Sequence, residues 1–396
     1  MKERSKTVFS LNHMPKAGKT IAVLGGGIGV VVAVHELSKR LMRQHKIVLI
    51  EKRKTHLYQP ALLWAALGLK KVADAEAAYG SFAKKRIEVV NAEILSLDPE
   101  NKSIKTDKGI IDFDSALIAL GAEFNSSEII GLEKFGLSFY EPAGAPKVFE
   151  AIDNFKGKSI ALVVSRLPFK CPAAPYEMAF LLDEFLKRKK IRDNVLVSFF
   201  TPELQPLPSA GIQVGKFVAK FLDKKNIRYH PNHILREVKK GELIFGSGTY
   251  TYDLLIYVPP HQAPKVIRDC KLAGERGWIP VDPKTLRTNF PGIYAIGDCT
   301  EIPITGGKFL PKAGVIAHGQ AEIAAHNIIL EMLNARDRES YHGFGSCFVE
   351  TGWGNAAYFS GHFYHQPTPS VRLWNSNPIS YWIKHLFARY WKWKWF

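Results

Sequence analysis

Cysteine is scarce in this chain, and its four residues, at positions 171, 270, 299 and 347, are widely separated. This spacing excludes a disulfide framework, and the absence of any C-x-x-C pair argues against a structural zinc site. His362 and His365 have ligand-like spacing but no companion ligands, so we expect no metal. Long apolar runs are also absent, since none reaches the roughly 18 residues that span a bilayer. The first residues are basic and lack the apolar stretch of a signal peptide, which predicts a flexible tail over residues 1–19.

Acidic residues are the second shortage. The chain has 54 Lys and Arg against 37 Asp and Glu, a formal charge of +17, which predicts an anionic partner such as nucleic acid, acidic lipid or an anionic substrate. No long Lys/Arg run or familiar nucleic-acid module accompanies the charge, so nucleic acid is not expected. Residues 351–396 contain no Asp or Glu at all, and five of the eight tryptophans of the chain lie between Trp374 and Trp395. This end of the chain is therefore chemically distinct.

The sequence Gly25-Gly26-Gly27-Ile28-Gly29 follows a predicted strand and opens a predicted helix. Such a turn lets the backbone approach a pyrophosphate at the helix N-terminus. Glu51, at the end of the next strand, is placed to bind an adenosine ribose, and Lys52 lies beside it. The third fingerprint position is Val30 instead of Gly or Ala, which predicts a helix slightly farther from its strand. Taken alone, the pattern is equally that of a simple tight turn.

Two distant segments strengthen this interpretation. "ALIALGA" ends in Gly121-Ala122, and "GIYAIGDC" ends in Gly297-Asp298 ahead of a helix. In this order, the three segments resemble the two-dinucleotide-domain flavoprotein disulfide reductase superfamily. The alternative, a domain that binds only NAD, does not explain the Gly297-Asp298 pair. The resemblance implies bound FAD, with Asp298 on the ribityl chain. It also implies that Lys312-Ala313 begins a helix at the pyrimidine end of the flavin, where a cation would stabilise the anionic reduced ring. A solvated lysine is the alternative.

Strands and helices alternate in two stretches, beginning near residues 20 and 158. This alternation predicts an α/β fold with two Rossmann-like dinucleotide-binding domains built on parallel sheets. We assign residues 20–125 and 286–335 to a discontinuous FAD-binding domain and residues 126–285 to the second domain. Residues 336–396 are assigned to a C-terminal region that carries a redox cysteine and an amphipathic, membrane-associating segment.

The second domain lacks a glycine loop for a nicotinamide cofactor. Its loop reads "SRLPFKCPAAP", and no glycine occurs between Gly157 and Gly211. Bulky side chains and prolines obstruct backbone approach to a pyrophosphate, so electrons are expected to enter by another route. Cys171 precedes a helix predicted over residues 175–189, where free N–H groups, the helix dipole and Lys170 would stabilise a thiolate. A structural cysteine is the alternative.

The contexts of two cysteines are more specific. "FKCPAAPYE" and "GSCFVETGWGN", with "THLYQPAL" and "LPKAGVIAHGQAEIAA", resemble sulfide:quinone oxidoreductase and the flavoprotein subunit of flavocytochrome c sulfide dehydrogenase over residues 20–396. The resemblance implies that Cys171 and Cys347 flank the flavin as a redox-active pair. Sulfide would attack their disulfide or persulfide bridge, and the thiolate released would react with the flavin. Glu177 matches a family carboxylate connected with proton handling; a first-turn carboxylate that favours the helix dipole is the alternative.

Two departures from the family pattern matter. "THLYQPALL" contains no cysteine for a thioether bond, so FAD is expected to bind noncovalently. The third functional cysteine of some family members is absent between the first two domains. Cys299 is expected to be a buried structural thiol, and Cys270 incidental.

The tail "NPISYWIKHLFARYWKWKWF" is predicted to form an amphipathic helix. Its apolar residues recur at helical spacing, with Lys384, His385, Arg389 and Lys392 largely on the other side: Ile379, Trp382, Ile383, Leu386, Tyr390 and Trp393. Trp with Lys/Arg and no acids suits a helix lying among lipid headgroups, while docking on the protein's own core or on a dimer partner is the alternative. Quinone would then reach the flavin from the bilayer along four aromatic residues, which are equally plausible as core: Phe344, Phe348, Trp353 and Phe359.

These observations predict a peripheral flavoprotein of a prokaryotic cell membrane. It would oxidise sulfide, yield sulfane sulfur or polysulfide, and reduce quinone. Sulfide, quinone and a membrane surface are its expected partners, and self-association into a homo-oligomer is left open. The alternatives are transfer of electrons to a cytochrome, an NADH:quinone reductase-like activity, or a flavoprotein scaffold without catalysis.

Overall fold

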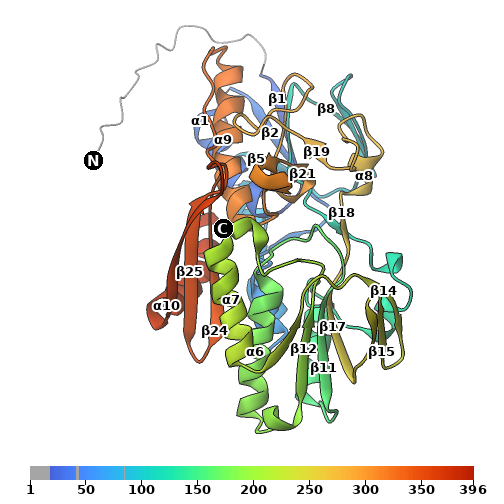
Figure 1. The fold of residues 1–396 in the computed structure, drawn as a ribbon. Helices are drawn as coiled ribbons and strands as arrows, with labels where there is room; N and C mark the ends of the chain where they lie inside the picture. Colours follow the sequence, from blue (N-terminus) through green and yellow to red (C-terminus); the bar gives the residue numbers. More distant parts are fainter. Residues whose placement is uncertain (1–17, 42–43, 84) are drawn as a thin grey trace.

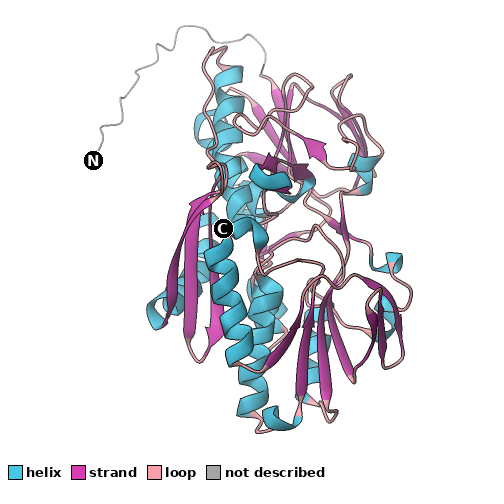
Figure 2. Cartoon of the chain, viewed as in Figure 1, coloured by secondary structure: helices cyan, strands magenta, loops and turns pink. Residues whose placement is uncertain are grey.

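The computed structural model describes residues 18–41, 44–83 and 85–396. The predicted tail over residues 1–19 lies outside the described residues except for its last two positions. Two parallel sheets frame the described part of the chain, and smaller sheets and two-stranded ribbons attach to them (Figures 1 and 2). The predicted α/β fold with two parallel sheets is therefore confirmed, whereas the domain boundaries stay a prediction.

The first sheet has the strand order β20-β9-β1-β2-β5, and all of its strands are parallel. They are β1 (Thr20–Leu24), β2 (Lys46–Ile50), β5 (Ile87–Val90), β9 (Ser115–Ile118) and β20 (Ile293–Ala295). Helices α1 (Ile28–Leu41) and α9 (Gly314–Met332) pack against each other and against one face of this sheet. Ile21 and Val23 of β1 join that helical cluster, while Ala22 and Leu24 join a second cluster on the opposite face. Burial on both faces explains why these strands are almost continuously apolar.

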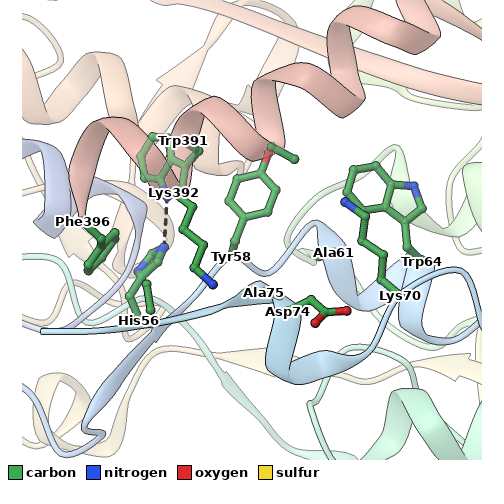
Figure 3. A pocket seen from close by; sticks show the side chains of 12 residues that line it. His56, Tyr58, Ala61, Trp64, Lys70, Asp74, Ala75, Trp391, Lys392 and Phe396 are labelled. Atoms are coloured by element: carbon green, nitrogen blue, oxygen red, sulfur yellow. Dashed lines mark hydrogen bonds between the residues drawn. The ribbon is translucent and has the colours of Figure 1, made fainter.

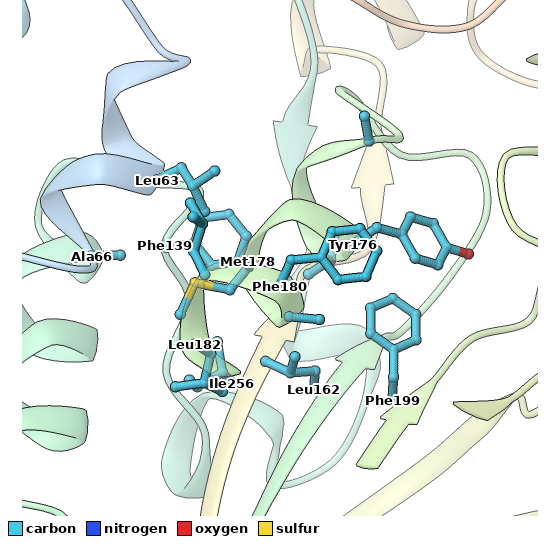
Figure 4. Packing of buried hydrophobic residues seen from close by; sticks show 14 of the residues in the cluster. Leu63, Ala66, Phe139, Leu162, Tyr176, Met178, Phe180, Leu182, Phe199 and Ile256 are labelled. Carbon is cyan, nitrogen blue, oxygen red and sulfur yellow. The ribbon is translucent and has the colours of Figure 1, made fainter. Parts of the chain in front are cut away.

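The second sheet has the order β13-β12-β11-β17 and is also parallel. Its strands are β11 (Ser159–Val164), β12 (Leu196–Phe200), β13 (Ile227–His230) and β17 (Leu254–Val258), and its main helices are α6 (Ala174–Arg188) and α7 (Ile212–Lys224). Tyr176 of α6 stacks on Phe199 of β12 with 4.7 Å between ring centroids (Figure 4). The helix predicted over residues 175–189 is α6, which begins and ends one residue earlier.

A three-stranded antiparallel sheet and a helix complete the C-terminal part. The strands are β24 (Phe344–Gly352), β25 (Asn355–His362) and β26 (Ser370–Asn377), and the helix is α10 (Pro378–Trp395). Asn377 caps α10, because its side chain accepts a hydrogen bond from the Ser380 N–H at 2.8 Å, and Pro378 occupies the first turn. The sheet lies beside α6 and α7, with α10 across it (Figure 1).

The remaining elements are shorter and connect these parts. The helices are α2 (Ala61–Ala65), α3 (Gly80–Ala83), α4 (Leu132–Phe135), α5 (Gly144–Asp153) and α8 (Lys265–Arg268). Two further antiparallel sheets consist of β6 (Ile94–Asp98), β7 (Ser103–Thr106) and β8 (Gly109–Asp112), and of β14 (Leu235–Lys239), β15 (Glu242–Phe245) and β16 (Gly248–Thr251). The ribbons pair β3 (Thr55–Leu57) with β4 (Glu76–Ala78), β10 (Glu123–Phe124) with β18 (His261–Gln262), β19 (Ile279–Pro280) with β21 (Thr300–Glu301), and β22 (Pro303–Ile304) with β23 (Lys308–Phe309). No helix within the described ranges combines the length and the apolar character that crossing a bilayer requires.

Candidate active site

The glycine turn between β1 and α1 has the form that a pyrophosphate needs. Gly25 has φ +110°, and a Cβ atom there would lie 2.5 Å from the Ala119 carbonyl oxygen, so only glycine fits. A Cβ on Gly27 or on Gly121 would meet nothing within 4 Å, which means that both glycines border open space. An open glycine-lined turn at the start of a helix fits the pyrophosphate of a dinucleotide.

The start of α1 also contacts the start of α9. A Cβ on Gly314 would lie 2.5 Å from Ile28 Cδ1, and one on Gly29 would lie 3.2 Å from the Ala317 carbonyl oxygen of α9. Ile28 and Gly29 therefore pack the two helix N-termini together. The predicted site residues 25–29 consequently lie beside the start of α9.

Glu51 and Lys52 differ in their placement. The Glu51 side chain is buried beside the glycine turn, where a Cβ on Gly26 would be 2.7 Å from Glu51 Oε2. Its other oxygen accepts hydrogen bonds from the backbone N–H and Nε of Arg53. The Lys52 ammonium instead pairs with the exposed Glu93 at 3.2 Å. Glu51 is thus in position for a ribose, whereas the side chain of Lys52 is engaged at the surface.

Gly297 and Asp298 follow β20 in a short 3₁₀ turn. Gly297 has φ +72°, and its N–H donates to Gln320 Oε1 of α9 at 2.8 Å. Burial raises the pKa of Asp298, and the ammonium groups of Lys170 and Lys312 oppose that rise. A partly buried carboxylate at this position fits the hydroxyl donors of a ribityl chain. Together with the open glycine turn, it makes the residues present compatible with FAD.

Lys312 and Ala313 precede α9 and do not belong to it. Ala313 is extended and forms the N-cap position, because α9 begins at Gly314. The Lys312 ammonium donates to the carbonyl oxygens of Asp298 and Thr300 at 2.7 and 2.9 Å and lies 3.5 Å from the Trp278 ring centroid. Burial lowers the pKa of Lys312 to about 8. The alternative of a solvated lysine is therefore wrong, and a role toward the flavin stays a prediction.

The loop between β11 and α6 carries Cys171 to the first domain. The Cys171 N–H donates to the Lys312 carbonyl oxygen at 2.7 Å, and Cys171 has φ +51°. The Tyr140 hydroxyl donates to the Lys170 carbonyl oxygen at 3.2 Å and holds the same loop. These contacts place the cysteine next to the residues that precede α9. The loop therefore joins the second domain to the predicted flavin site.

Cys347 reaches the same region from β24. It pairs across the strands with Phe359 of β25 and packs against the core cluster that contains α6. Burial raises the pKa of Cys347, and Cys171 raises it further. Burial and both cysteines likewise raise the pKa of Tyr58. The fold therefore brings together two free thiols and a tyrosine that are far apart in the sequence.

The protonation of Cys171 differs from the expectation based on the helix start. Burial raises its pKa, while Lys384 and, more weakly, Lys170 lower it. The sequence predicted that the helix start and Lys170 would lower the pKa of Cys171. This prediction is wrong, because burial raises the pKa of the thiol more than the nearby cations lower it. Lys170 does act in the expected direction, but Lys384 of α10 acts more strongly.

A buried ionic cluster, formed by Glu177, Glu350, Lys384 and His385, lies beneath α10. The Lys384 ammonium hydrogen-bonds Glu177 of α6 and lies 2.9 Å from Glu350 Oε1 of β24. His385 Nε2 is 3.3 Å from the same Glu350 oxygen, and Trp64 Nε1 donates to it at 2.8 Å. The Lys384, Glu177 and Glu350 side chains are only 12%, 6% and 2% exposed. Glu177 thus binds a lysine that lies more than two hundred positions away in the sequence.

Lys384 and Glu350 were missed as site residues. Glu350 lies three residues after Cys347 in the segment that carries the family resemblance, which was a usable signal. Lys384 was predicted on the polar side of the tail helix, and that side faces the protein interior at this point. The outer side of α10 exposes Ile379, Trp382, Ile383, Leu386, Phe387, Tyr390 and Trp393. The predicted tail helix is confirmed, and its inner face docks on the protein.

The four aromatic residues predicted to line a quinone path do not share one face. Phe344 and Phe348 alternate with Cys347 along β24, so they point to the face opposite Cys347, while Phe359 pairs with Cys347 and is buried in the core. Trp353, at the tip of the β24–β25 hairpin, is 54% exposed and lies near Arg188. A continuous path through all four is therefore wrong.

A small cavity of about 30 Å³ lies instead under the end of α10 (Figure 3). Its walls include Tyr58, Trp64 and Lys70 on one side and Trp391 and Phe396 on the other. Trp391 Nε1 donates to His56 Nε2 at 3.3 Å, and His56 Nδ1–H donates to the Gly26 carbonyl oxygen at 2.8 Å. The end of α10 is thus connected to the glycine turn through one histidine.

The other two cysteines are held by local contacts. Cys299 is fully buried, with its thiol 3.2 Å from the Ile296 carbonyl oxygen, and burial raises its pKa to about 11. Cys270 is partly buried and accepts a hydrogen bond from the Leu272 N–H. In the part of the chain that the structure describes, no three or more His, Cys, Asp or Glu side chains are grouped to hold a metal ion.

Comparisons with known proteins agree with this geometry. Mitochondrial sulfide:quinone oxidoreductase of Mus musculus is 26% identical over 84% of this chain and 76% of its own length. Sulfide-quinone reductase of Aquifex aeolicus is 24% identical over 95% of this chain and 91% of its own length, and the solved structure of the Aquifex enzyme superimposes with a TM-score of 0.86. A Type II NADH:quinone oxidoreductase of Staphylococcus aureus is 22% identical over 83% of this chain and 86% of its own length. These findings confirm the resemblance noted from the two cysteine contexts.

A sequence model of the pyridine nucleotide-disulphide oxidoreductase family matches residues 19–155 and 177–321. The unmatched interval, residues 156–176, contains β11 and the loop with Cys171. The match thus covers the whole first sheet and three strands of the second, but it omits β11 and the loop in which this chain lacks glycines. The chain belongs to the pyridine nucleotide-disulphide oxidoreductase family.

Proposed function

We propose that this chain is a flavin-dependent sulfide:quinone oxidoreductase. The observation that carries the proposal is the meeting of Cys171 and Cys347 beside the residues that precede α9. Relatives named for this activity match most of the chain, which supports the same conclusion. Family membership implies a flavin-dependent oxidoreductase, and the cofactor proposed here is noncovalent FAD.

The chain's own residues would hold FAD at three places. The glycine turn would bind the pyrophosphate, Glu51 the adenosine ribose, and Asp298 the ribityl chain. The segment between β3 and α2 has no cysteine for a covalent bond. When bound, FAD would accept two electrons from the thiol pair and pass them to quinone.

The cysteines would act on sulfide by thiol–disulfide exchange. Hydrosulfide attacks one sulfur of the oxidised pair, the S–S bond breaks, and the products are one cysteine persulfide and one cysteine thiolate. The Cys171 loop is held by its hydrogen bond to Lys312, so the cysteine keeps its position next to the predicted flavin site during exchange. A second hydrosulfide would attack the outer sulfur of the persulfide, so that sulfane sulfur leaves as polysulfide and a cysteine thiolate remains. The two thiols would then form their disulfide again while two electrons pass to bound FAD.

A nicotinamide reductant is the main alternative, since Type II NADH:quinone oxidoreductases share the fold. The β11–α6 loop argues against binding of a nicotinamide cofactor. Phe169, Cys171 and Pro172 occupy the turn in which glycines would let the backbone approach a pyrophosphate. In steady state, we expect decylubiquinone reduction with sulfide as donor and at most a trace with NADH, followed by quinone absorbance. Faster turnover with NADH than with sulfide would reject the proposal.

We further propose that the outer face of α10 binds the membrane surface. Its side chains include Trp393 and Trp382, which are 80% and 62% exposed, and Lys392 and Lys394 lie on the same helix. Exposed tryptophans flanked by lysines suit the headgroup region of an anionic bilayer. The cavity under α10 is then the proposed approach for a quinone headgroup toward Tyr58, although its small volume requires side chains to move. Location in a prokaryotic cell membrane and self-association stay predictions.

Removing the two exposed tryptophans tests the membrane proposal. Trp382→Asp/Trp393→Asp should weaken binding to phosphatidylglycerol-containing vesicles at least ~10-fold, because each large apolar side chain contributes roughly 1.5–3 kcal/mol when buried. Vesicle sedimentation measures the effect. Ile110→Asp is the control, since Ile110 is 70% exposed on the distant β8. Equal binding by all three proteins would contradict the membrane role of α10.

A further inference from the structure

The carbonyl oxygen of Gly26, in the glycine turn between β1 and α1, is held by two side chains from outside the turn. His56 Nδ1–H of β3 donates to it at 2.8 Å, and the Tyr79 hydroxyl donates to it at 2.7 Å. Both side chains are buried, so water does not compete for the oxygen. A carbonyl that accepts from two buried donors has both of its lone pairs engaged and cannot turn freely. These two side chains therefore fix the geometry of the turn.

Holding this carbonyl also orients the N–H that follows it. The peptide bond between Gly26 and Gly27 is trans, so the Gly27 N–H points away from the Gly26 oxygen and from its two donors. A Cβ on Gly27 would meet nothing within 4 Å, which places this N–H on the open side of the turn. Backbone N–H groups at the start of a helix lack helical partners and are the donors that bind a pyrophosphate. His56 and Tyr79 thus orient one donor of the site proposed for FAD.

Helix α10 holds His56 from the other side of its ring. Trp391 Nε1 donates to His56 Nε2 at 3.3 Å (Figure 3). An indole N–H can only donate and a carbonyl oxygen can only accept, so the two hydrogen bonds select the neutral ring with its proton on Nδ1. Burial lowers the pKa of His56 to about 4, which agrees with a neutral ring. The Trp391 indole is therefore joined to the Gly26 carbonyl by a chain of two hydrogen bonds.

Phe396, which follows α10, packs on both donors to this carbonyl. Its ring stacks on His56 with 5.3 Å between centroids and on Phe82 of α3 with 5.2 Å. The Tyr79 ring lies 6.3 Å from it. The docked end of α10 therefore supports the glycine turn by packing as well as by hydrogen bonding.

We propose that the docked end of α10 determines how tightly the protein retains FAD. Trp391 and Phe396 hold the two donors to the Gly26 carbonyl, and this keeps the next N–H directed toward the pyrophosphate site. All four side chains are positioning residues, because they act on the cofactor through the turn. The helix whose outer face is proposed to bind the membrane then stabilises the bound flavin with its inner face. The inference rests on the proposed function only in placing FAD at the glycine turn.

Release of FAD from the purified holoprotein tests this inference without any turnover. The flavin that has left the protein is collected by ultrafiltration at intervals and quantified by its absorbance. Trp391→Phe keeps an aromatic ring but loses the indole N–H, so it should raise the release rate about fivefold, the usual effect of one hydrogen bond. His56→Leu loses both hydrogen bonds of the histidine and should raise the rate at least ~10-fold. His56→Asn has an amide N–H in the place of Nδ1–H and should recover most of that loss.

A double variant separates the hydrogen-bonded chain from packing. In the His56→Asn background the acceptor for Trp391 is already absent, so Trp391→Phe should add nothing to the release rate. Trp395→Phe is the matched control, because Trp395 packs on His35 of α1 with 4.9 Å between ring centroids, and FAD should leave it at the wild-type rate. If His56→Leu does not fold, the other variants carry the test.

Two results would overturn the inference even if sulfide oxidation itself is confirmed. One is release of FAD from Trp391→Phe at the wild-type rate. The other is an undiminished effect of Trp391→Phe in the His56→Asn background, which would assign the loss to packing alone. Conversely, the expected release rates in a protein that does not oxidise sulfide would refute the proposed function and leave this inference standing.

Discussion

Replacing Cys171 or Cys347 by serine should abolish reduction of the bound flavin by sulfide. Each variant should lose at least ~1,000-fold in the rate of flavin bleaching, because a serine hydroxyl neither forms a disulfide nor attacks as a thiolate at neutral pH. Anaerobic stopped-flow absorbance at the flavin band measures the loss. Dithionite should still bleach the flavin in both variants, since direct chemical reduction does not need the thiol pair.

Cys270→Ser is the matched control for this experiment. Cys270 is partly buried in a separate core cluster, and its thiol accepts only a local hydrogen bond. We expect this variant to bleach at the wild-type rate. If Cys171→Ser or Cys347→Ser also retains that rate, the two thiols are structural and sulfide reaches the flavin in another way.

Loss of the Lys384 charge should have the second-largest effect, this time on stability. Lys384→Met leaves Glu177 and Glu350 buried without their cation, and breaking a buried ion pair from one side costs about 3–5 kcal/mol. The midpoint of urea unfolding, followed by tryptophan fluorescence, should fall accordingly.

A compensating variant separates charge from packing. Lys384→Met/Glu177→Gln/Glu350→Gln removes the unpaired carboxylates together with the lysine, so it should recover most of the lost stability. If the triple variant is as unstable as Lys384→Met, the loss comes from packing of the lysine stem and not from the unpaired charges of its buried partners. If Lys384→Met unfolds at the wild-type midpoint, the buried cluster contributes nothing to folding.

The local structure around the proposed flavin site was predictable because its signals lie close together in the sequence. Gly25 needs a positive φ and has no room for a Cβ, and both requirements come from a turn that joins a strand to the next helix. The strands on either side are apolar runs with a defined length, and the same holds for the second sheet. Sequence patterns therefore indicated the α/β fold, the two sheets and the place of Asp298.

Contacts between distant segments were not predictable. The pairing of Lys384 with Glu177 and Glu350 depends on how α10 docks, and helical periodicity alone could not tell a solvated face from one buried against carboxylates. The net pKa shift of Cys171 was missed for the same reason, because the degree of burial of a loop depends on its tertiary neighbours. The predicted quinone path along aromatic residues was wrong because side chains alternate between the two faces of a strand. Phe348 and Phe359 therefore lie on opposite faces of one hairpin.

The central claim is that electrons enter from sulfide through the thiol pair and leave to quinone. Its most direct test is an anaerobic double-mixing experiment, in which the purified holoprotein meets sulfide or NADH and then decylubiquinone, with the flavin absorbance followed throughout. The account predicts rapid bleaching by sulfide, little or none by NADH, and recovery of the oxidised spectrum on addition of quinone. Rapid bleaching by NADH with none by sulfide would contradict it.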